Sequence, residues 1–368
     1  MIEVVVTERE DIADFYSSLS VAVKDSDGTV LSTGGFKYTE SSFGKDNVKA
    51  LLAGGIATPV QYRRQGSVRK MFDKMHNDAV NEGAAVALLH PFSFAYYRKF
   101  GYEKVADHLI VKFPTRMIDF VPRCCNFVPY DESKLPDIIK IYNTFSKGRN
   151  LLLRRFNNNP YNNPKKQVFI CYKGNEPIAY LVYSVYQELK VNHLTNGVLT
   201  VHELAYTSPD ALREIFSFLR MFEGEFEEIV FANIAMCPEI DLLLRNYMHT
   251  SYSIVPDIMA KVLNTEKMLS AHNYPMKEGE FILKVEDSMP SVEGTFKVSY
   301  GGGDCIIRRS EDSADITLSS TAFSRLIYGY DGVNADIAKY MEGVIIDKNA
   351  EDFFRAFTKK PCGIFEHF

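Results

Sequence analysis

The chain has 368 residues, of which 46% are hydrophobic and 24% charged. This composition provides enough apolar material for two or three domain cores and excludes a disordered or fibrous protein. Its 42 Lys and Arg against 47 Asp and Glu give a net charge of -5, so no bulk positive field attracts phosphate backbones, and we expect no nucleic-acid partner.

The N-terminus carries acidic residues where a secretion signal would be basic and then apolar, and no stretch reaches the ~18 uncharged apolar residues of a membrane span. The six cysteines show no C-x-x-C spacing, and no His/Cys cluster has the spacing of metal ligands. We therefore expect a cytoplasmic protein with reduced thiols, no membrane partner and no metal.

The first third of the chain is predicted to be a mixed α/β unit. A short helix would open it, because Thr7 and Glu10 have capping-box spacing and Ile12, Phe15 and Leu19 recur at helical intervals. Two hairpin strands, a third strand, an amphipathic helix, a buried strand, a short helix and a last strand would follow, at residues 20–24, 30–37, 50–58, 64–81, 85–89, 94–99 and 102–112.

The second third repeats this order. After a helix over 135–145, a hairpin, a strand, a helix, a strand, a short helix and a strand are predicted at residues 167–186, 198–206, 209–222, 228–233, 241–245 and 254–262. Such repetition, at an offset of about 145 residues, predicts a duplicated α/β domain.

The tail differs, with strands predicted at 281–285, 294–299, 304–307 and 316–319, a helix at 321–327, and a last helix capped by Asn349 that carries Phe353, Phe354 and Phe357 on one side. We interpret it as a third, α+β domain, and the glycines at 301–303 as a turn. The chain ends G-I-F-E-H-F, and two Phe among the last four residues predict docking on an apolar surface.

The segment most informative about function joins the third predicted strand to the following helix. It reads R-R-Q-G-S-V from Arg63 to Val68, so backbone N–H groups at the helix start would converge on a spot that Gly66 keeps accessible. Two adjacent arginines add forked donors suited to a pyrophosphate. The pattern indicates a phosphate-binding loop, and a solvated basic helix start is the plain alternative.

This loop, followed by P-F-S-F-A-Y-Y-R-K-F-G-Y-E at residues 91–103, resembles the acyl-CoA-binding core of the GNAT N-acetyltransferases. The run Tyr97 to Tyr102, the repeated domain and the terminal Phe are more closely similar to the Eis (enhanced intracellular survival) family. The resemblance implies mixed α/β sheets in three domains: a catalytic GNAT domain at 1–118, a degenerate GNAT-like domain at 119–272 and a sterol-carrier-protein-like domain at 273–368.

The resemblance implies acetyl-CoA as co-substrate. Its pantetheine would lie along the strand end and its pyrophosphate on the following loop, which makes the expected cofactor residues Ile56, Ala57, Thr58, Arg63, Arg64, Gly66, Ser67 and Val68. At the equivalent place the second copy has T-S-P-D-A over 207–211, with neither Arg nor Gly. We therefore expect it to be catalytically silent, with one acetyl-CoA per chain.

The resemblance also implies the catalytic groups. Tyr97 would be the general acid, because a phenol with a pKa near ~10 can protonate a departing thiolate whose thiol has a pKa near ~8.5. The α-carboxylate of Phe368 would be the base, which requires burial because an exposed α-carboxyl has a pKa near ~3.5. His90 matches a pocket histidine of the family and is a candidate to share that role; a lone histidine at a strand end is otherwise structural.

The expected reaction is transfer of an acetyl group to a primary amine of the aminoglycoside, polyamine or lysine type, on a small molecule or a peptide. The resemblance also implies a homo-oligomer, hexameric in relatives. Two alternatives stay open: a different acyl or aminoacyl transferase on the same scaffold, and a protein that only binds acyl-CoA or, through its third domain, a lipid.

Overall fold

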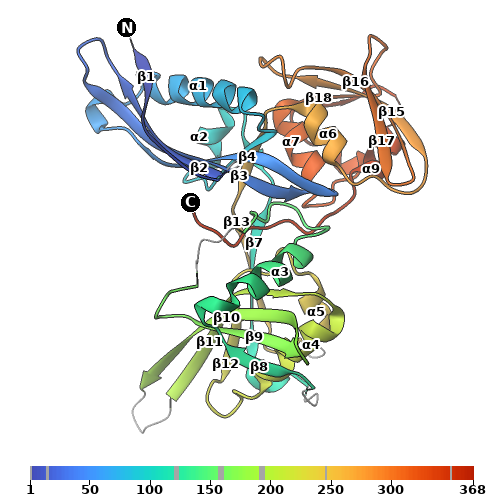
Figure 1. Ribbon diagram of the computed structural model, residues 1–368. Coiled ribbons are helices and arrows are strands. Elements are labelled where there is room, and N and C mark those ends of the chain that lie inside the picture. The colour runs from blue at the N-terminus through green and yellow to red at the C-terminus, as the bar shows by residue number, and fades with distance from the viewer. Residues whose placement is uncertain are drawn as a thin grey trace. The chain divides into compact units, whose positions relative to one another are not determined.

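The computed structural model describes residues 2–13, 16–119, 124–155, 161–189, 195–244, 247–348 and 350–368. The chain divides into two compact units (Figure 1). The first consists of Met1–Ala106, Asn150–Leu153 and Asp257–Phe368, and the second of Asp107–Arg149 and Arg154–Pro256. No helix in the described part of the chain is long and apolar enough to cross a membrane.

The first unit contains a sheet with, in the described residues, seven strands. Their spatial order is β1 (Glu3–Ala13), β2 (Tyr16–Lys24), β3 (Val30–Phe43), β4 (Asp46–Ala57), β5 (Val86–Leu89), β14 (Met259–Val262) and β6 (Glu103–Lys104). Only β4 and β5 run parallel in this described sheet, and they are joined through α1 (Ser67–Asn81). The short α2 (Phe94–Arg98) follows β5.

The predicted opening helix is wrong. Glu3–Ala13 is a strand that forms an antiparallel hairpin with β2, pairing Glu3 with Lys24 and Ala13 with Tyr16. Residues 14 and 15 lie outside the described part of the chain. The segment begins with a β-branched run, V-V-V-T, which favours strand over helix, and β2 buries Leu19, Val21 and Val23 at strand rather than helical spacing.

The second unit repeats the arrangement. Its described sheet has the order β8 (Asn126–Pro129), β9 (Gln167–Lys173), β10 (Glu176–Leu189), β11 (Thr195–Tyr206), β12 (Glu228–Phe231), β7 (Asp107–Pro114) and β13 (Ser251–Pro256). It carries α3 (Leu135–Phe145), α4 (Pro209–Arg220) and α5 (Glu239–Leu243). β11 and β12 are parallel, as β4 and β5 are, so the predicted duplication is confirmed.

Two segments, each predicted as one strand, are instead broken in two. Residues 102–112 give β6 and β7, and residues 254–262 give β13 and β14, and the halves belong to different sheets. At the breaks the Val105 N–H donates to Ile258 O at 2.9 Å, and the Asp257 N–H donates to Ala106 O at 3.3 Å. Each sheet therefore contains one inner strand from the other repeat: β14 lies in the sheet of the first repeat, and β7 lies in the sheet of the second.

The C-terminal part of the first unit has a second sheet, with the described order β17 (Asp304–Arg309), β16 (Gly294–Gly301), β15 (Gly279–Glu286), β18 (Ile316–Ser319) and β19 (Val344–Ile346). Its helices are α6 (Thr265–Ala271), α7 (Ser320–Tyr328), α8 (Ala335–Ala338) and α9 (Glu351–Ala356). The predicted turn at 301–303 joins β16 to β17. Asn349, the predicted cap of the last helix, lies outside the described residues.

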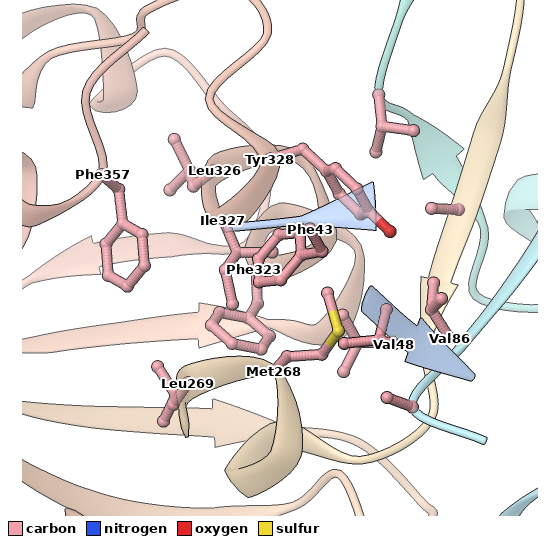
Figure 2. Close-up of a cluster of buried hydrophobic side chains, with 14 of the residues drawn as sticks. Phe43, Val48, Val86, Met268, Leu269, Phe323, Leu326, Ile327, Tyr328 and Phe357 are labelled. Atoms are coloured by element: carbon pink, nitrogen blue, oxygen red, sulfur yellow. The ribbon is translucent and has the colours of Figure 1, made fainter. Parts of the chain in front are cut away.

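The first sheet is buried on both faces, which fixes the C-terminal part against it. Alternate residues of β4 belong to two apolar cores, Leu51 and Ala53 with α1 on one face and Ala50 and Leu52 with the C-terminal elements on the other. Figure 2 shows the second core, where Phe43, Val48 and Val86 of the first sheet pack with side chains of α6 and α7. The rings of Phe43 and Tyr328 lie 5.2 Å apart.

The first core encloses a polar pair whose protonation should affect stability. His76 Nε2 lies 2.9 Å from the buried Tyr102 hydroxyl, and burial lowers the pKa of His76 to about 3. In the unfolded chain, where a histidine has a pKa near ~6.5, His76 binds a proton below that pH, whereas in the folded chain it stays neutral. We expect the unfolding free energy to fall as pH drops from about 6.5 toward 3, by up to ~1.4 kcal/mol per pH unit from this group.

Denaturant unfolding of the wild type and His76→Gln between pH 4 and 8 measures this contribution. The variant should show a shallower decline below pH 6.5, and equal slopes in the two proteins would contradict the assignment.

Candidate active site

The candidate site begins where β4 extends beyond the end of the neighbouring strand β5. Parallel pairing runs from Ala50 opposite Val86 to Ala53 opposite Leu89, whereas β4 continues to Ala57. A register shift against β3, between Gly54 and Ala57, accompanies a left-handed Gly55 with φ of 60°. In the described residues, the β5-side edge of β4 therefore lacks a strand partner beyond Ala53, and an extended ligand can hydrogen-bond there.

The predicted phosphate loop follows β4 after one 3-10 turn, Val60–Tyr62. Gly66, with φ of 79°, is the N-cap of α1, and the helix's first backbone bond runs from the Lys70 N–H to Gly66 O at 3.1 Å. The N–H groups of residues 67–69 are thus left over at the helix start. A buried pair of hydroxyls, Ser32 and Ser67 at 2.5 Å, ties the loop to β3.

Residues of the β4 end and of the phosphate loop line one cavity of about 550 Å³. The structure brings seven of the eight expected cofactor residues to it, all but Ala57, together with five that the sequence reasoning did not select: Arg69, Phe92, Tyr96, Lys99 and Phe100. Among its described lining residues there are three arginines and a lysine and no acid. Such a cavity suits a polyanionic ligand with an extended apolar arm.

Tyr97 lies on α2, whose first turn is capped by the Ser93 hydroxyl accepting from the Tyr96 N–H. Its side chain is buried among aromatic rings, with centroids 5.3 Å from Phe92 and 6.2 Å from Phe72. Burial, and secondarily Tyr96, raises the pKa of Tyr97 to about 12. The phenol therefore remains a proton donor throughout the neutral range.

The remainder of the Tyr97 motif holds α2 in place. Arg98 donates to both carboxylate oxygens of Glu103, at 2.7 and 2.8 Å, a forked pair that closes the turn between them. Gly101 within that turn has φ of 88°, a conformation that favours glycine. Arg98 and Glu103 both belong to the 91–103 sequence motif, but the sequence alone did not predict that they form an ion pair.

The end of the chain lies on β4. A Cβ at Gly54 would lie 2.8 Å from both the carboxyl carbon and an oxygen of Phe368, so the carboxyl group rests directly on the strand, two positions before the cavity residue Ile56. The ring of Phe368 packs 4.8 Å from that of His90. Phe368 is partly buried against the C-terminal core, as predicted from the apolar terminus.

His90 follows β5 and is hydrogen-bonded on both sides. Its Nδ1 lies 2.8 Å from Oδ1 of Asp257, and its Nε2 lies 3.0 Å from the carbonyl oxygen of Glu366. Sequence reasoning missed Gly54 and Asp257. The glycine pair inside a strand was a signal for close approach, whereas nothing near Asp257 in sequence points to this site.

The corresponding helix start of the second unit is already occupied. The Ser208 hydroxyl caps α4 by accepting from the Ala211 N–H at 3.2 Å, and Pro209 has no N–H to offer. Asp210 in the first turn pairs with Arg213 at 2.7 Å. This helix start is unsuited to a phosphate. In the described part of the chain, no group of three or more His, Cys, Asp or Glu gathers that could hold a metal ion.

Comparisons with known families agree with this architecture. The chain matches two families that are each described as acetyltransferase (GNAT) domain, one over residues 5–105 and the other over residues 150–262. It matches the family described as sterol carrier protein domain over residues 265–357. It is thus a tandem GNAT protein with a C-terminal sterol carrier protein domain. No curated protein matches the sequence.

Solved structures share the fold at low identity. Eis1 from Mycobacterium abscessus is 15% identical with a TM-score of 0.79 over 100% of both chains. A GCN5-related N-acetyltransferase from Anabaena variabilis is 15% identical (TM-score 0.81, 95% of this chain and 89% of that one), and a probable N-acyltransferase from Enterococcus faecalis is 17% identical (0.79, 95% and 89%). The predicted fold class and the resemblance to the Eis-like GNAT proteins are confirmed in domain content and fold.

Proposed function

We propose that the first unit transfers an acetyl group from acetyl-CoA to a primary amine. The observation that carries this proposal is the arginine-lined cavity that opens from the strand end on which the chain's own carboxyl group rests. The pyrophosphate would bind the N–H groups at the start of α1 and the arginines around them. The pantetheine would pair with the unpartnered edge of β4 beyond Ala53.

The reaction then needs one acid and one base. The amine nitrogen attacks the thioester carbonyl, and the tetrahedral intermediate collapses to an amide as the C–S bond breaks. Tyr97 gives its proton to the departing thiolate, and the Phe368 carboxylate takes the proton released by the amine. Partial burial of Phe368 supports this role, since withdrawal from water raises the basicity of a carboxylate.

The acceptor class is proposed from the Eis-like fold: aminoglycosides, polyamines and lysine side chains. The deciding experiment measures CoA thiol release from acetyl-CoA and from longer acyl-CoAs across a panel of these amines. Amine-dependent release that is fastest with acetyl-CoA supports the proposal. Acetyl-CoA binding without release by any amine would instead favour a protein that only binds acyl-CoA.

Removing one arginine of the phosphate loop should weaken acetyl-CoA binding. Arg64 has a left-handed backbone, with φ of 64°, so Arg64→Gly deletes the guanidinium without straining the loop. We expect KM for acetyl-CoA to rise about tenfold with little change in kcat, the size of one lost charge-assisted hydrogen bond. Arg213→Ala, beside the equivalent helix start of the second unit, is the control; equal KM values in wild type and Arg64→Gly would exclude Arg64 from the binding site.

A further inference from the structure

We propose that His90 is a positioning residue that holds the end of the chain on β4, and that it is not a base. The inference rests on the proposed role of the Phe368 carboxylate. Its starting point is the hydrogen bonding of the imidazole, which has a partner at each nitrogen: Asp257 at Nδ1, 2.8 Å away, and the Glu366 carbonyl at Nε2, 3.0 Å away.

The second of these bonds fixes the role of Nε2. A backbone carbonyl oxygen can only accept, so Nε2 carries a hydrogen and donates it to Glu366. A general base needs a lone pair at the nitrogen that faces the substrate. His90 instead presents an N–H to the polypeptide, two residues before the carboxyl group.

The tail that His90 holds is also anchored further back, by Asn150. The Asn150 N–H donates to Pro361 O at 2.9 Å, and its carbonyl accepts from the Gly363 N–H at 3.2 Å. Its buried side chain accepts from the Gly44 N–H and donates to Tyr328 O. Asn150 thereby fixes the tail as far as residue 363.

Between residue 363 and the carboxyl group, the His90 bond to Glu366 is a further polar contact that orients the backbone. The rings of His90 and Phe368, which are tilted by 55° to one another, add an apolar contact, with their centroids 4.8 Å apart. Without the bond to Glu366, the last residues regain conformational freedom, and the carboxyl group spends less time on Gly54. Because misplacing a catalytic group by about 1 Å can cost ~100-fold in rate, the bond bears directly on turnover.

Asp257→Asn separates the two roles of His90. In the positioning role, the new amide donates to Nδ1 of a neutral imidazole, the proton stays on Nε2, and the bond to Glu366 survives. Turnover should then remain within about threefold of wild type. If His90 were the base, oriented by Asp257, the same change would put the proton on the reacting nitrogen and lower kcat by roughly 10³-fold or more.

The position of the tail can be measured without any transferase assay. A carboxypeptidase that prefers aromatic C-terminal residues removes Phe368 only when the tail leaves β4, and mass spectrometry follows the loss. His90→Phe keeps a ring against Phe368 but has no N–H; we expect release at least tenfold faster, kcat lower by about 10- to 100-fold and KM for acetyl-CoA unchanged. His90→Gln, whose amide can still donate to Glu366, should release Phe368 more slowly than His90→Phe and have a higher kcat.

His272→Gln is the matched control. This buried imidazole also places its Nε2 at a carbonyl of the same unit, Ala356 at 2.9 Å, so its loss should lower stability without speeding Phe368 release.

Two results would overturn the proposal: release from His90→Phe at the wild-type rate, or a large loss of kcat in Asp257→Asn while Phe368 remains protected. Should the wild type transfer no acyl group, the proposed function fails, whereas the release rates still decide whether His90 holds the tail. If His90→Phe does not fold, Asp257→Asn and His90→Gln still carry the test.

Discussion

Tyr97→Phe should lower kcat by roughly 10² to 10⁴ while acetyl-CoA affinity stays within about twofold. The substitution removes one hydroxyl and keeps the ring that packs against Phe72, Phe92 and Tyr102. The cavity residues on either side, Tyr96 and Phe100, are untouched. Without the phenol, water must protonate the departing thiolate, which slows the collapse of the tetrahedral intermediate.

The pH profile provides a second readout of Tyr97. Since the pKa of Tyr97 is raised to about 12, the active, protonated phenol persists until the pH approaches that value. Between pH 8 and 10, the kcat of the wild type should therefore not decline relative to that of Tyr97→Phe, because the phenol stays protonated.

Tyr38→Phe is the control for this pair of measurements. Tyr38 is another buried tyrosine of the first sheet, and burial raises its pKa as well, but it lies on β3 and not on α2. A Tyr97→Phe enzyme with wild-type kcat would remove Tyr97 from the mechanism.

What the sequence could predict of this site was local in the chain. The short segment from Ala57 to Val68 brings a strand end, a left-handed glycine and a helix start together, and each depends on its immediate neighbours. The same holds for α1, whose apolar residues recur at helical spacing, and for the short α2. These features were predictable because short-range sterics and periodicity determine them.

The groups that meet at the end of the chain come from remote segments. Gly54 meets Phe368 and His90 meets Asp257 only after the chain has crossed between the two sheets, and the crossing interrupts strands whose apolar pattern shows no break. Residues 254–262 read as one strand because strand periodicity carries no information about which sheet a strand joins. Asp257 lies at that crossing.

The failure of the opening helix has a related cause. A capping-box spacing at Thr7 and Glu10 is a weak local preference, whereas pairing along the whole of β2 contributes a ladder of hydrogen bonds. Tertiary pairing therefore overrides both the cap and the short helical spacing of Ile12, Phe15 and Leu19.

Gly54→Ala should lower kcat by about 10- to 100-fold, through displacement of the Phe368 carboxyl group. A Cβ there would lie 2.8 Å from both the carboxyl carbon and an oxygen of Phe368, closer than nonbonded carbon contacts allow. Gly54 does not have a left-handed backbone, so alanine fits the strand and only the tail must move. Steady-state kinetics and the rate of Phe368 release by a carboxypeptidase measure the two consequences, and release should become faster.

Gly35→Ala offers a matched control, because Gly35 is the register partner of Gly54 on β3 and its added Cβ would meet only Gly54 O at 3.5 Å, an ordinary contact. A truncated chain that lacks Phe368 completes the argument. If Gly54→Ala acts through the carboxyl group, it should cost nothing further in the residual rate of that chain, since both changes remove the same interaction. An equal fold-loss in the full and truncated chains would mean that Gly54→Ala does not act through the Phe368 carboxyl group.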